Sequence, residues 1–273
     1  MHEKEDFLIP KALTIAGNDT IGGAGIAADL KTMLACGVYG MPVITALTAQ
    51  NTMGVSAIED VSESFIKEQI NAVYRDVIPD AVKVGMLGRP SVVRAVTERL
   101  DYYKVRRLVV DPVMVATSGA RLLTEDAERE LTHLFALATV ITPNLTEAEA
   151  LLGRAISSEE EMERAATELR DRYGTAVLVK GGHAPDGAND VLASDEGVRW
   201  YRVRRIPEKS ENGTHGTGCT LSSAIASYLA RGLSLEEAVG RAKDYTYGAI
   251  EHAFTFAEAS NLLDHGWGIN REK

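Results

Sequence analysis

Short apolar runs alternate with amphipathic segments along most of this 273-residue chain. The runs are rich in Val, Ile and Thr, and most of them end in or beside Gly, Pro or Asn, which is typical of buried β-strands. On this basis we predict strands over residues 12–17, 42–49, 81–87, 107–114, 139–144 and 176–182.

Helical periodicity fills several of the intervening segments. Residues 63–77 carry four apolar side chains on one helical face, at spacings of four, three and four: Ile66, Ile70, Val73 and Val77. Residues 157–174 begin with serines and acids and end at a glycine, as helix capping and the helix dipole prefer. Two more long helices are predicted over residues 217–232 and 234–254.

The order of these elements predicts the fold class. Repeated β-α units imply an α/β protein with a central, mostly parallel sheet and helices on both faces, which is a three-layer sandwich. Residues 190–206 interrupt the alternation with two short β runs around the sequence DEG, and this pattern predicts a hairpin. Because the chain shows no fixed repeat, low-complexity tract or linker, we predict one domain over residues 1–273.

Composition and charge narrow the classes of partner. The chain is 45% hydrophobic and 25% charged, as in ordinary globular proteins, and its formal net charge is −10 at pH 7. That acidity argues against nucleic-acid binding and leaves small molecules as the expected partners. The acidic N-terminus is unlike a signal peptide, and no apolar stretch is long enough to span a membrane. We therefore expect a cytoplasmic protein, and its two cysteines, Cys36 and Cys219, fit a reducing compartment.

Polar and Gly-rich motifs follow the predicted strands. In an open parallel sheet ligands bind beyond the carboxyl ends of the strands, so these motifs are expected to meet at one edge. In chain order they read GNDTIGGAG, TAQNT, GML, DPVM, TPNLTEAE, KGGH and GTHGTGC. The first Gly-rich turn matches neither a dinucleotide fingerprint nor a Walker A loop, so it is either an anion site or a packing turn. His183 and His215 lack the spacing of zinc ligands and are interpreted as polar loop residues.

The segment GTHGTGCT before the helix at 217–232 carries the most specific chemistry. Gly216 and Gly218 let backbone N–H groups turn inward, and the helix N-terminus adds partial positive charge, which suits a transferring phosphoryl group. The thiol of Cys219 is expected to feel the same helix end, with a pKa nearer to neutral than that of a free thiol. It can then accept the proton of an attacking hydroxyl; the alternative is a small cysteine that only packs.

Charged residues at strand ends complete the candidate site. Asp111 ends an apolar strand, which is costly unless the carboxylate is paired or bound to a metal. Glu147 lies in the first helical turn after Asn144, either as a ligand of Mg²⁺ on the nucleotide side or as part of a helix cap. Lys180 either reaches phosphate oxygens as a point charge or is an ordinary strand-end lysine.

Eight ordered segments resemble one enzyme family. They run from about Ala12 to His252 and include LTIAG, GGAGI, VITALTAQNT, KVGML, DPVM, ITPNLTEAEAL, VLVKGGH and THGTGCTLSSAIA. The chain resembles the ribokinase superfamily and, within it, the hydroxymethylpyrimidine/phosphomethylpyrimidine kinases of thiamin biosynthesis. The resemblance implies a single ribokinase-like domain that uses ATP and Mg²⁺. It also implies phosphorylation of 4-amino-5-hydroxymethyl-2-methylpyrimidine, and then of its monophosphate to the diphosphate.

The resemblance assigns roles to residues at matching positions. An amide such as Gln50 can pair with both the amino group and a ring nitrogen of the pyrimidine. Other residues implied to line the pyrimidine are Ala24, Asp29, Thr48, Met86 and Val113. Residues implied to contact ATP are Asn144, Lys180, Thr214, Gly216 and Gly218. The implied metal ligands are Asp111 and Glu147. The implied catalytic groups are Lys180, the anion hole of Gly216, Thr217 and Gly218, and Cys219, which stands where many sugar kinases place an aspartate.

Two other functions stay open from the sequence. A pyridoxal or pyridoxine kinase shares the scaffold, and its substrate also carries a hydroxymethyl group on a nitrogen-containing ring, but TAQNT favours the pyrimidine. A non-catalytic sensor of the aminopyrimidine or its phosphate belongs to a different class, and the presence of Asp111, Lys180 and Cys219 argues against it. We further expect a homodimer.

Overall fold

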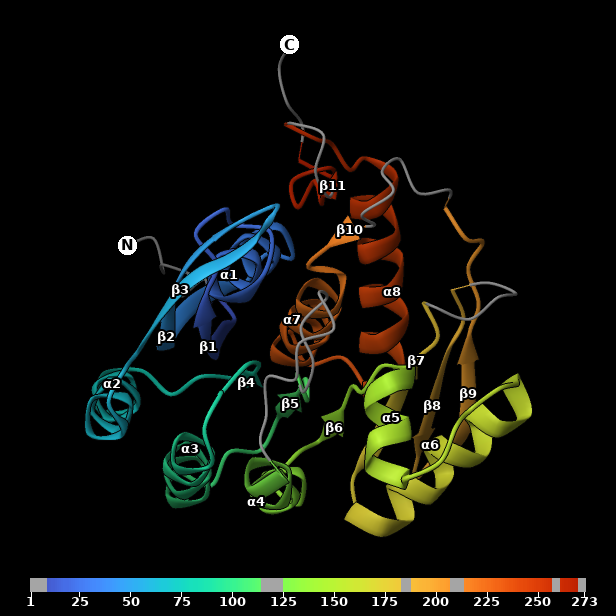
Figure 1. Ribbon diagram of the computed structural model, residues 1–273, viewed down its shortest axis with the longest axis horizontal. Helices are drawn as coiled ribbons and strands as arrows, with labels where there is room; N and C mark the ends of the chain where they lie inside the picture. Colours follow the sequence, from blue (N-terminus) through green and yellow to red (C-terminus); the bar gives the residue numbers. More distant parts are fainter. Residues whose placement is uncertain (1–8, 114–124, 183–187, 207–213, 257–260, 270–273) are drawn as a thin grey trace, which may run out of the picture.

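A computed structural model describes residues 9–113, 125–182, 188–206, 214–256 and 261–269 (Figure 1). The main sheet is parallel from β2 to β7 in its spatial order and antiparallel at both edges. Its nine strands, in that order, are β3 (Gly54–Asp60), β2 (Tyr39–Asn51), β1 (Lys11–Asn18), β4 (Ala81–Val84), β5 (Leu108–Val110), β6 (Val140–Ile141), β7 (Ala176–Lys180), β8 (Asp190–Ser194) and β9 (Gly197–Tyr201). The predicted mostly parallel sheet is confirmed.

Helices cover both faces of this sheet, as the β-α alternation predicts (Figure 1). One face packs against α1 (Gly25–Ala35), α7 (Thr217–Ala230) and α8 (Leu235–Glu251). The other packs against α2 (Glu63–Asp76), α3 (Pro90–Tyr102), α4 (Glu125–Phe135), α5 (Leu145–Leu152) and α6 (Glu159–Tyr173). No helix among the described residues combines the length and the apolar character needed to cross a membrane.

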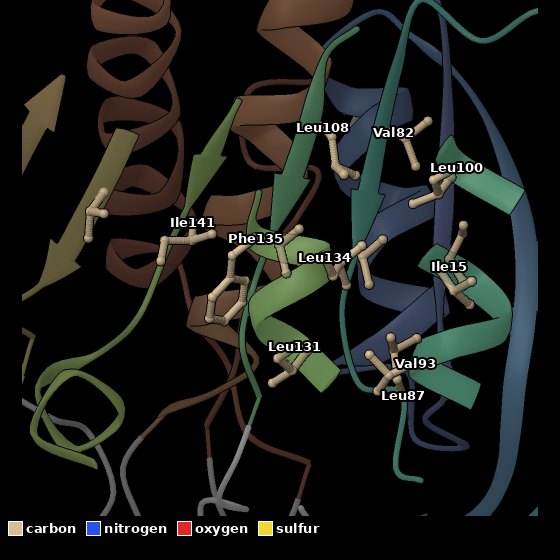
Figure 2. Packing of buried hydrophobic residues seen from close by; sticks show 14 of the residues in the cluster. Ile15, Val82, Leu87, Val93, Leu100, Leu108, Leu131, Leu134, Phe135 and Ile141 are labelled. Atoms are coloured by element: carbon tan, nitrogen blue, oxygen red, sulfur yellow. The ribbon is translucent and has the colours of Figure 1, made fainter. Parts of the chain in front are cut away.

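Alternation along the strands divides the core into two layers. In β4, Val82 and Val84 join the layer that faces α2 to α6, whereas Ala81 joins the layer that faces α1, α7 and α8. Figure 2 shows the first layer, where Ile15, Val82 and Leu108 from adjacent strands meet the helices. The same alternation turns Lys83 toward α1 and α7, where its side chain is fully buried, and this lysine forms part of the site described below.

The structure adds elements that the sequence pattern does not predict. All residues of β3 are exposed, so this edge strand lacks the apolar alternation by which strands are recognised. A second, two-stranded sheet pairs β10 (Thr214–His215) with β11 (Asn261–Leu262), and both strands are too short for a periodic signal. The predicted hairpin at 190–206 is confirmed as the antiparallel pair β8–β9.

Candidate active site

Two Gly-rich turns meet at the carboxyl end of the sheet. Gly216, immediately before α7, has a φ of 89°, and a Cβ atom on it would lie 1.8 Å from the carbonyl oxygen of Gly23. Gly25, the first residue of α1, has a φ of 54°, and a Cβ atom on it would lie 2.3 Å from the carbonyl oxygen of Gly17. Only glycine fits these positions, so the two turns pack backbone to backbone and fix the N-terminus of α7 beside β1.

A buried ion pair lies against the first turn of α7. Lys180 Nζ donates to Asp111 Oδ1 at 2.7 Å, and the Thr142 hydroxyl donates to the same oxygen at 3.1 Å. A Cβ atom on Gly218 would lie 3.3 Å from Lys180 Nζ and 3.4 Å from Asp111 Oδ2. The helix backbone at Gly218 therefore lies close to both charged groups, with little room for a larger side chain. The ammonium group and the positive end of the helix thus face the same small volume, which suits phosphate oxygens.

Both members of this pair are held in their charged forms. Burial favours the neutral carboxylic acid, but the cations of Lys180 and Lys83 hold the pKa of Asp111 below its usual value. Burial likewise favours the neutral amine, but the carboxylates of Asp111 and Glu147 raise the pKa of Lys180. At neutral pH the site therefore contains a fixed cation next to a fixed anion.

Glu147 takes part in a helix cap close to Lys180. Its Oε2 accepts from the backbone N–H of Asn144 at 2.8 Å, while Asn144 Oδ1 accepts from the backbone N–H of Glu147 at 2.9 Å. The backbone N–H of Lys180 donates to the carbonyl oxygen of Pro143 at 2.8 Å, which holds the end of β7 beside the start of α5. The capping interpretation of Glu147 is thus confirmed, and the cap leaves its carboxylate near the Lys180 ammonium group.

The available oxygen ligands fit a cation that is shared with phosphate groups. Mg²⁺ is usually bound through one or two carboxylates together with substrate phosphates and water. Asp111 and Glu147 supply two carboxylates that follow the adjacent strands β5 and β6, and Asp111 Oδ2 has only a long, 3.4 Å contact from Ser222 Oγ among the hydrogen bonds of the described residues. No cluster of three His, Cys, Asp or Glu residues in the described part of the chain is arranged to hold a metal by itself.

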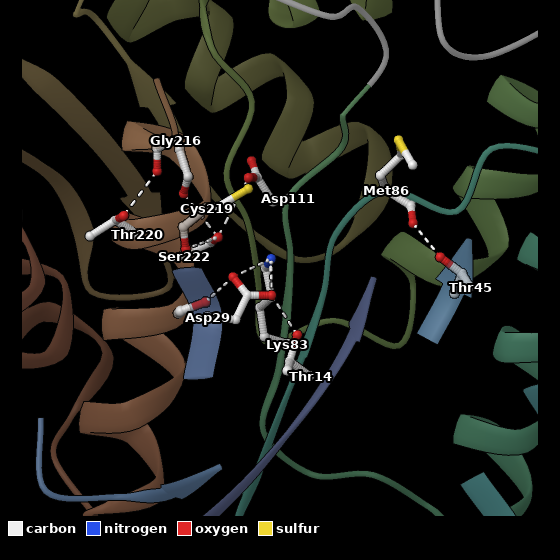
Figure 3. A network of polar contacts seen from close by, with 12 residues as sticks. Thr14, Asp29, Thr45, Lys83, Met86, Asp111, Gly216, Cys219, Thr220 and Ser222 are labelled. Carbon is white, nitrogen blue, oxygen red and sulfur yellow. Dashed lines mark hydrogen bonds and ion pairs between the residues drawn. The ribbon is translucent and has the colours of Figure 1, made fainter. Parts of the chain in front are cut away.

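A second ion pair lies beneath the site and was not recognised from the sequence. Lys83 Nζ donates to both carboxylate oxygens of Asp29, at 2.9 and 2.8 Å, and both side chains are fully buried (Figure 3). Thr14, the neighbour of Lys83 across β1 and β4, donates to Oδ2 at 2.6 Å, and Ser223 of α7 donates to Oδ1 at 2.6 Å. Asp29 was predicted to line the pyrimidine, but its two oxygens are occupied by these three side chains.

The environment of Cys219 contradicts the expectation of a lowered pKa. Figure 3 shows the sulfur atom directed toward Asp111. Burial raises the pKa of the Cys219 thiol to about 11, and the carboxylates of Asp29 and Asp111 act in the same direction, against the Lys83 cation. The sequence indicated the helix N-terminus but neither the partial burial of the thiol nor the two nearby anions. At neutral pH Cys219 is therefore a thiol.

His215 links the first Gly-rich turn to β2. Its Nε2 lies 3.0 Å from Asp19 Oδ2 and 3.3 Å from the side-chain nitrogen of Gln50. Asp19 also accepts backbone N–H groups from the turn, including those of Gly23 at 3.0 Å and Ala24 at 2.8 Å. Burial opposes ionisation, but the hydrogen bond from His215 and those from the backbone lower the pKa of Asp19. The interpretation of His215 as a simple polar loop residue is wrong.

Several residues predicted to contact the pyrimidine lie near this histidine. Thr48 donates to the carbonyl oxygen of Asn18 at 2.7 Å and lies 3.3 Å from Gln50 Oε1, while Ala24 precedes α1. Met86 lies along the same edge, because a Cβ atom on Gly17 would be 2.6 Å from its terminal methyl carbon.

The other predicted contact residues lie at the end of β5 and at the start of α7. Val113 directly follows the Asp111 strand end, and its backbone N–H donates to the Asp111 carbonyl oxygen at 2.8 Å. Thr214 pairs with Asn261 through β10 and β11, and Thr217 is the first residue of α7. His183 lies outside the described residues.

Comparison with known proteins identifies relatives along nearly the whole chain. The phosphomethylpyrimidine kinase family profile matches residues 19–264. The hydroxymethylpyrimidine/phosphomethylpyrimidine kinase of Rhizobium meliloti (strain 1021) is 49% identical over 245 residues, which make up 89% of this chain and 91% of that protein. The thiamine biosynthesis bifunctional protein ThiED of Geobacter sulfurreducens is 46% identical over 255 residues, or 93% of this chain, but the chain spans only about half, 51%, of that longer protein.

Solved structures show the same relationship. Phosphomethylpyrimidine kinase from Clostridium difficile 630 is 46% identical with a TM-score of 0.79, covering 88% of this chain and 99% of its own. The pyridoxal kinase from Staphylococcus aureus in complex with pyridoxal is 31% identical with a TM-score of 0.87, covering 97% and 96%. Both classes share the ribokinase-like α/β fold, which confirms the predicted fold class, and the sequence identity is higher to the pyrimidine kinases. The chain therefore belongs to the hydroxymethylpyrimidine/phosphomethylpyrimidine kinase family.

Proposed function

We propose that this kinase transfers the γ-phosphoryl group of ATP to the hydroxymethyl group of 4-amino-5-hydroxymethyl-2-methylpyrimidine, and then phosphorylates the monophosphate to the diphosphate, for thiamin biosynthesis. The observation that carries the proposal is the Lys180–Asp111 pair, which lies against the first turn of α7. Gln50 lies at the same carboxyl end of the sheet. The family relationship supports the substrate class, and these contacts support a site with a phosphate-binding part near α7 and a ring-binding part near Gln50.

The phosphoryl group is held by fixed positive charge. Backbone N–H groups at Gly216, Thr217 and Gly218 carry the positive end of α7, and Lys180 adds a full charge beside them. Negative charge on the transferring group is therefore met by groups that need no rearrangement, which is the main source of catalysis in phosphoryl transfer. Asn144 and Thr214 complete the nucleotide side of the proposed site.

Asp111 and Glu147 are the residues that would hold Mg²⁺ with the nucleotide. The bound ion would neutralise phosphate charge during transfer. The ionised state of Asp111 and the position of Glu147 beside Lys180 support this assignment.

Cys219 is the proposed acceptor of the hydroxymethyl proton. With a pKa of about 11, only a fraction on the order of 10⁻⁴ of the thiol is ionised at pH 7. Because only the thiolate can accept the proton, the rate of the reaction would rise with the thiolate fraction as the pH rises. Residual activity would remain without the base, because phosphoryl transfer depends mainly on positioning and charge stabilisation.

The pyrimidine would be held by the amide of Gln50 and lined by Ala24, Thr48, Met86 and Val113. Asp29 would act from below this surface, because its carboxylate is already bound to Lys83, Thr14 and Ser223. It supports the site through Ser223, which lies one helical turn after Cys219 on α7.

Product analysis tests the proposal. The purified protein is incubated with ATP, Mg²⁺ and either the aminopyrimidine alcohol or pyridoxal, and the products are resolved by mass spectrometry over time. We expect the pyrimidine monophosphate first and the diphosphate later. Formation of the monophosphate alone would contradict the second step, and faster turnover of pyridoxal than of either pyrimidine would assign the chain to vitamin B6 salvage.

We also infer that the protein acts as one domain and as a cytoplasmic homodimer, with small molecules and no nucleic acid as its other partners. Large apolar side chains are exposed on and near the β2–β3 hairpin: Leu47, Met53, Val55 and Ile58. A second copy would cover both this surface and the unpaired edge of β3. Light scattering coupled to size-exclusion chromatography should give a dimer, and Ile58→Lys should shift it toward monomer; a monomeric parent protein would contradict the proposal.

A further inference from the structure

One nitrogen of His215, Nε2, contacts two side chains. One contact requires this nitrogen to donate a hydrogen bond, whereas the other, as the Gln50 amide is placed, would require it to accept one. Nε2 lies 3.0 Å from Asp19 Oδ2 and 3.3 Å from the terminal nitrogen of Gln50. The Asp19 carboxylate is nearly fully buried, accepts backbone N–H groups from Ile21, Gly23 and Ala24, and has a lowered pKa. An ionised carboxylate only accepts hydrogen bonds, so His215 Nε2 must carry a hydrogen, whether the ring is neutral or protonated.

That hydrogen determines which way round the Gln50 amide lies. A nitrogen that already carries a hydrogen cannot accept from the NH₂ group of Gln50. The amide carbonyl, in contrast, can share that hydrogen with the Asp19 carboxylate as the second acceptor of a three-centre hydrogen bond, so the carbonyl is the end of the amide that fits His215. The oxygen and nitrogen of an amide exchange places by a half turn about the last side-chain bond. The half turn leaves the positions of all other atoms unchanged.

Thr48 independently requires the same orientation. Its hydroxyl hydrogen is directed to the carbonyl oxygen of Asn18 at 2.7 Å, so toward Gln50, 3.3 Å away, its oxygen can only accept. The Gln50 atom facing Thr48 must therefore be the NH₂ group. His215 and Thr48 therefore require the same orientation of the Gln50 amide.

We propose that His215, held by Asp19, acts with Thr48 as a specificity-determining pair that locks the Gln50 amide with its carbonyl toward His215 and its NH₂ group toward Thr48. This inference rests on the proposed function, in which Gln50 contacts the pyrimidine. After these two contacts the amide keeps one oxygen lone pair and one N–H. Those are the groups needed by a ring edge that presents an amino N–H beside an acceptor nitrogen.

The locked amide selects against the reversed edge. A 4-oxo ring presents a carbonyl oxygen and a ring N–H in place of the amino group and the ring nitrogen. Against the locked amide, the carbonyl oxygen of the ring would face the Gln50 carbonyl oxygen, and the ring N–H would face the Gln50 NH₂ group. Turning the ring over would restore pairing but would move the 5-hydroxymethyl group away from the phosphoryl site. The lock therefore converts two hydrogen bonds into discrimination between amino and oxo rings.

The test compares the 4-amino alcohol with 4-oxo-5-hydroxymethyl-2-methylpyrimidine, each assayed with ATP for kcat/KM and each titrated calorimetrically. For the parent protein we expect a preference for the amino ring of at least about tenfold, the equivalent of one or more lost hydrogen bonds. His215→Phe should reduce that preference by about tenfold, because the amide becomes free to rotate. Thr48→Val should also reduce it, and this variant keeps the shape of the side chain and the β10–β11 contact.

Leu262→Ala provides the matched control. Leu262 pairs with His215 across β10 and β11, and both side chains crowd the same Cβ position on Gly23, at 2.9 and 2.7 Å. Its truncation should loosen this packing and weaken both rings equally, with the preference unchanged.

The outcomes separate the two proposals. An unchanged preference in both His215→Phe and Thr48→Val, or an equal loss of preference in Leu262→Ala, would overturn the lock. A parent protein that does not phosphorylate the aminopyrimidine would instead overturn the proposed function.

Discussion

Lys83 and Asp29 form an ion pair in which both side chains have no exposed surface, and Lys83 Nζ lies within 2.9 Å of each carboxylate oxygen. The pair joins β4 to α1, and Ser223 extends it to α7. A buried charge whose partner is removed is strongly destabilising, because its lost hydration is no longer offset. The first turns of α7 therefore rest on a charged pair within the core.

Lys83→Met should lower the free energy of unfolding by about 3–5 kcal/mol, since it leaves Asp29 charged and unpaired in the core. Urea denaturation followed by circular dichroism measures the change. Lys67→Met is the control, because the Lys67–Glu98 pair is exposed and should contribute no more than about 1 kcal/mol. Adding Asp29→Asn to Lys83→Met should restore part of the loss. Equal effects of the two lysine substitutions would refute the structural role of Lys83.

The rate of phosphoryl transfer should rise with pH if Cys219 is the proton acceptor. Its pKa is raised to about 11, so the thiolate fraction increases about tenfold per pH unit throughout the neutral and mildly alkaline range. Measurements of kcat between pH 6.5 and 9 should follow that increase, and Cys219→Ala should be slower, by about 10²-fold or more at high pH, and lose the dependence. Cys36→Ala is the control, because Cys36 is the other cysteine of the chain and lies at the C-terminal end of α1, opposite the end that adjoins the site. A Cys219→Ala profile that still rises in parallel would mean that the thiol only packs.

Glu147→Gln separates metal binding from helix capping. A glutamine oxygen can still accept from the backbone N–H of Asn144, so the cap and the stability should be preserved. The loss of negative charge should raise the Mg²⁺ concentration needed for half-maximal activity and the KM for ATP by about tenfold, while calorimetry shows unchanged pyrimidine binding. Glu237→Gln, in the equivalent cap of α8, is the matched control and should change neither. Unchanged Mg²⁺ and ATP dependence in Glu147→Gln would leave Glu147 with the capping role alone.

Gly216→Ala should abolish most activity by separating the two Gly-rich turns. The added Cβ would lie 1.8 Å from the Gly23 carbonyl oxygen, so the backbone must move. Gly232 provides a comparison, because it has a nearly identical φ of 87° and open space around its Cβ position. Gly232→Ala should therefore cost only the backbone strain, about 1 kcal/mol, and keep full turnover. Thermal unfolding and kcat together distinguish the cases, and similar behaviour of the two variants would contradict the contact between the turns.

Local pattern was sufficient for the architecture of this protein. The short apolar runs of β1, β4 and β5 and the helical periodicity of α2 and α6 are patterns of residues close together in the sequence, and each element appears near its expected position. Strand-end motifs were also predictable as a group, because parallel strands direct their carboxyl ends to one edge. The edge strand β3 escaped prediction since it buries neither face and leaves no periodic signal.

The chemical state of the site depends on contacts that no local pattern contains. The sequence placed Cys219 at a helix N-terminus and so suggested a lowered pKa, but burial beside Asp29 and Asp111 raises it. Lys83 reads as a polar interruption of a strand until Asp29, 54 residues away, is seen to hold it. His215 acquires its role only from Asp19 and Gln50, which lie far from it in the sequence. Periodicity specifies which face of an element is buried, whereas electrostatic energies depend on distance and hydration, and both are defined only when the chain has folded.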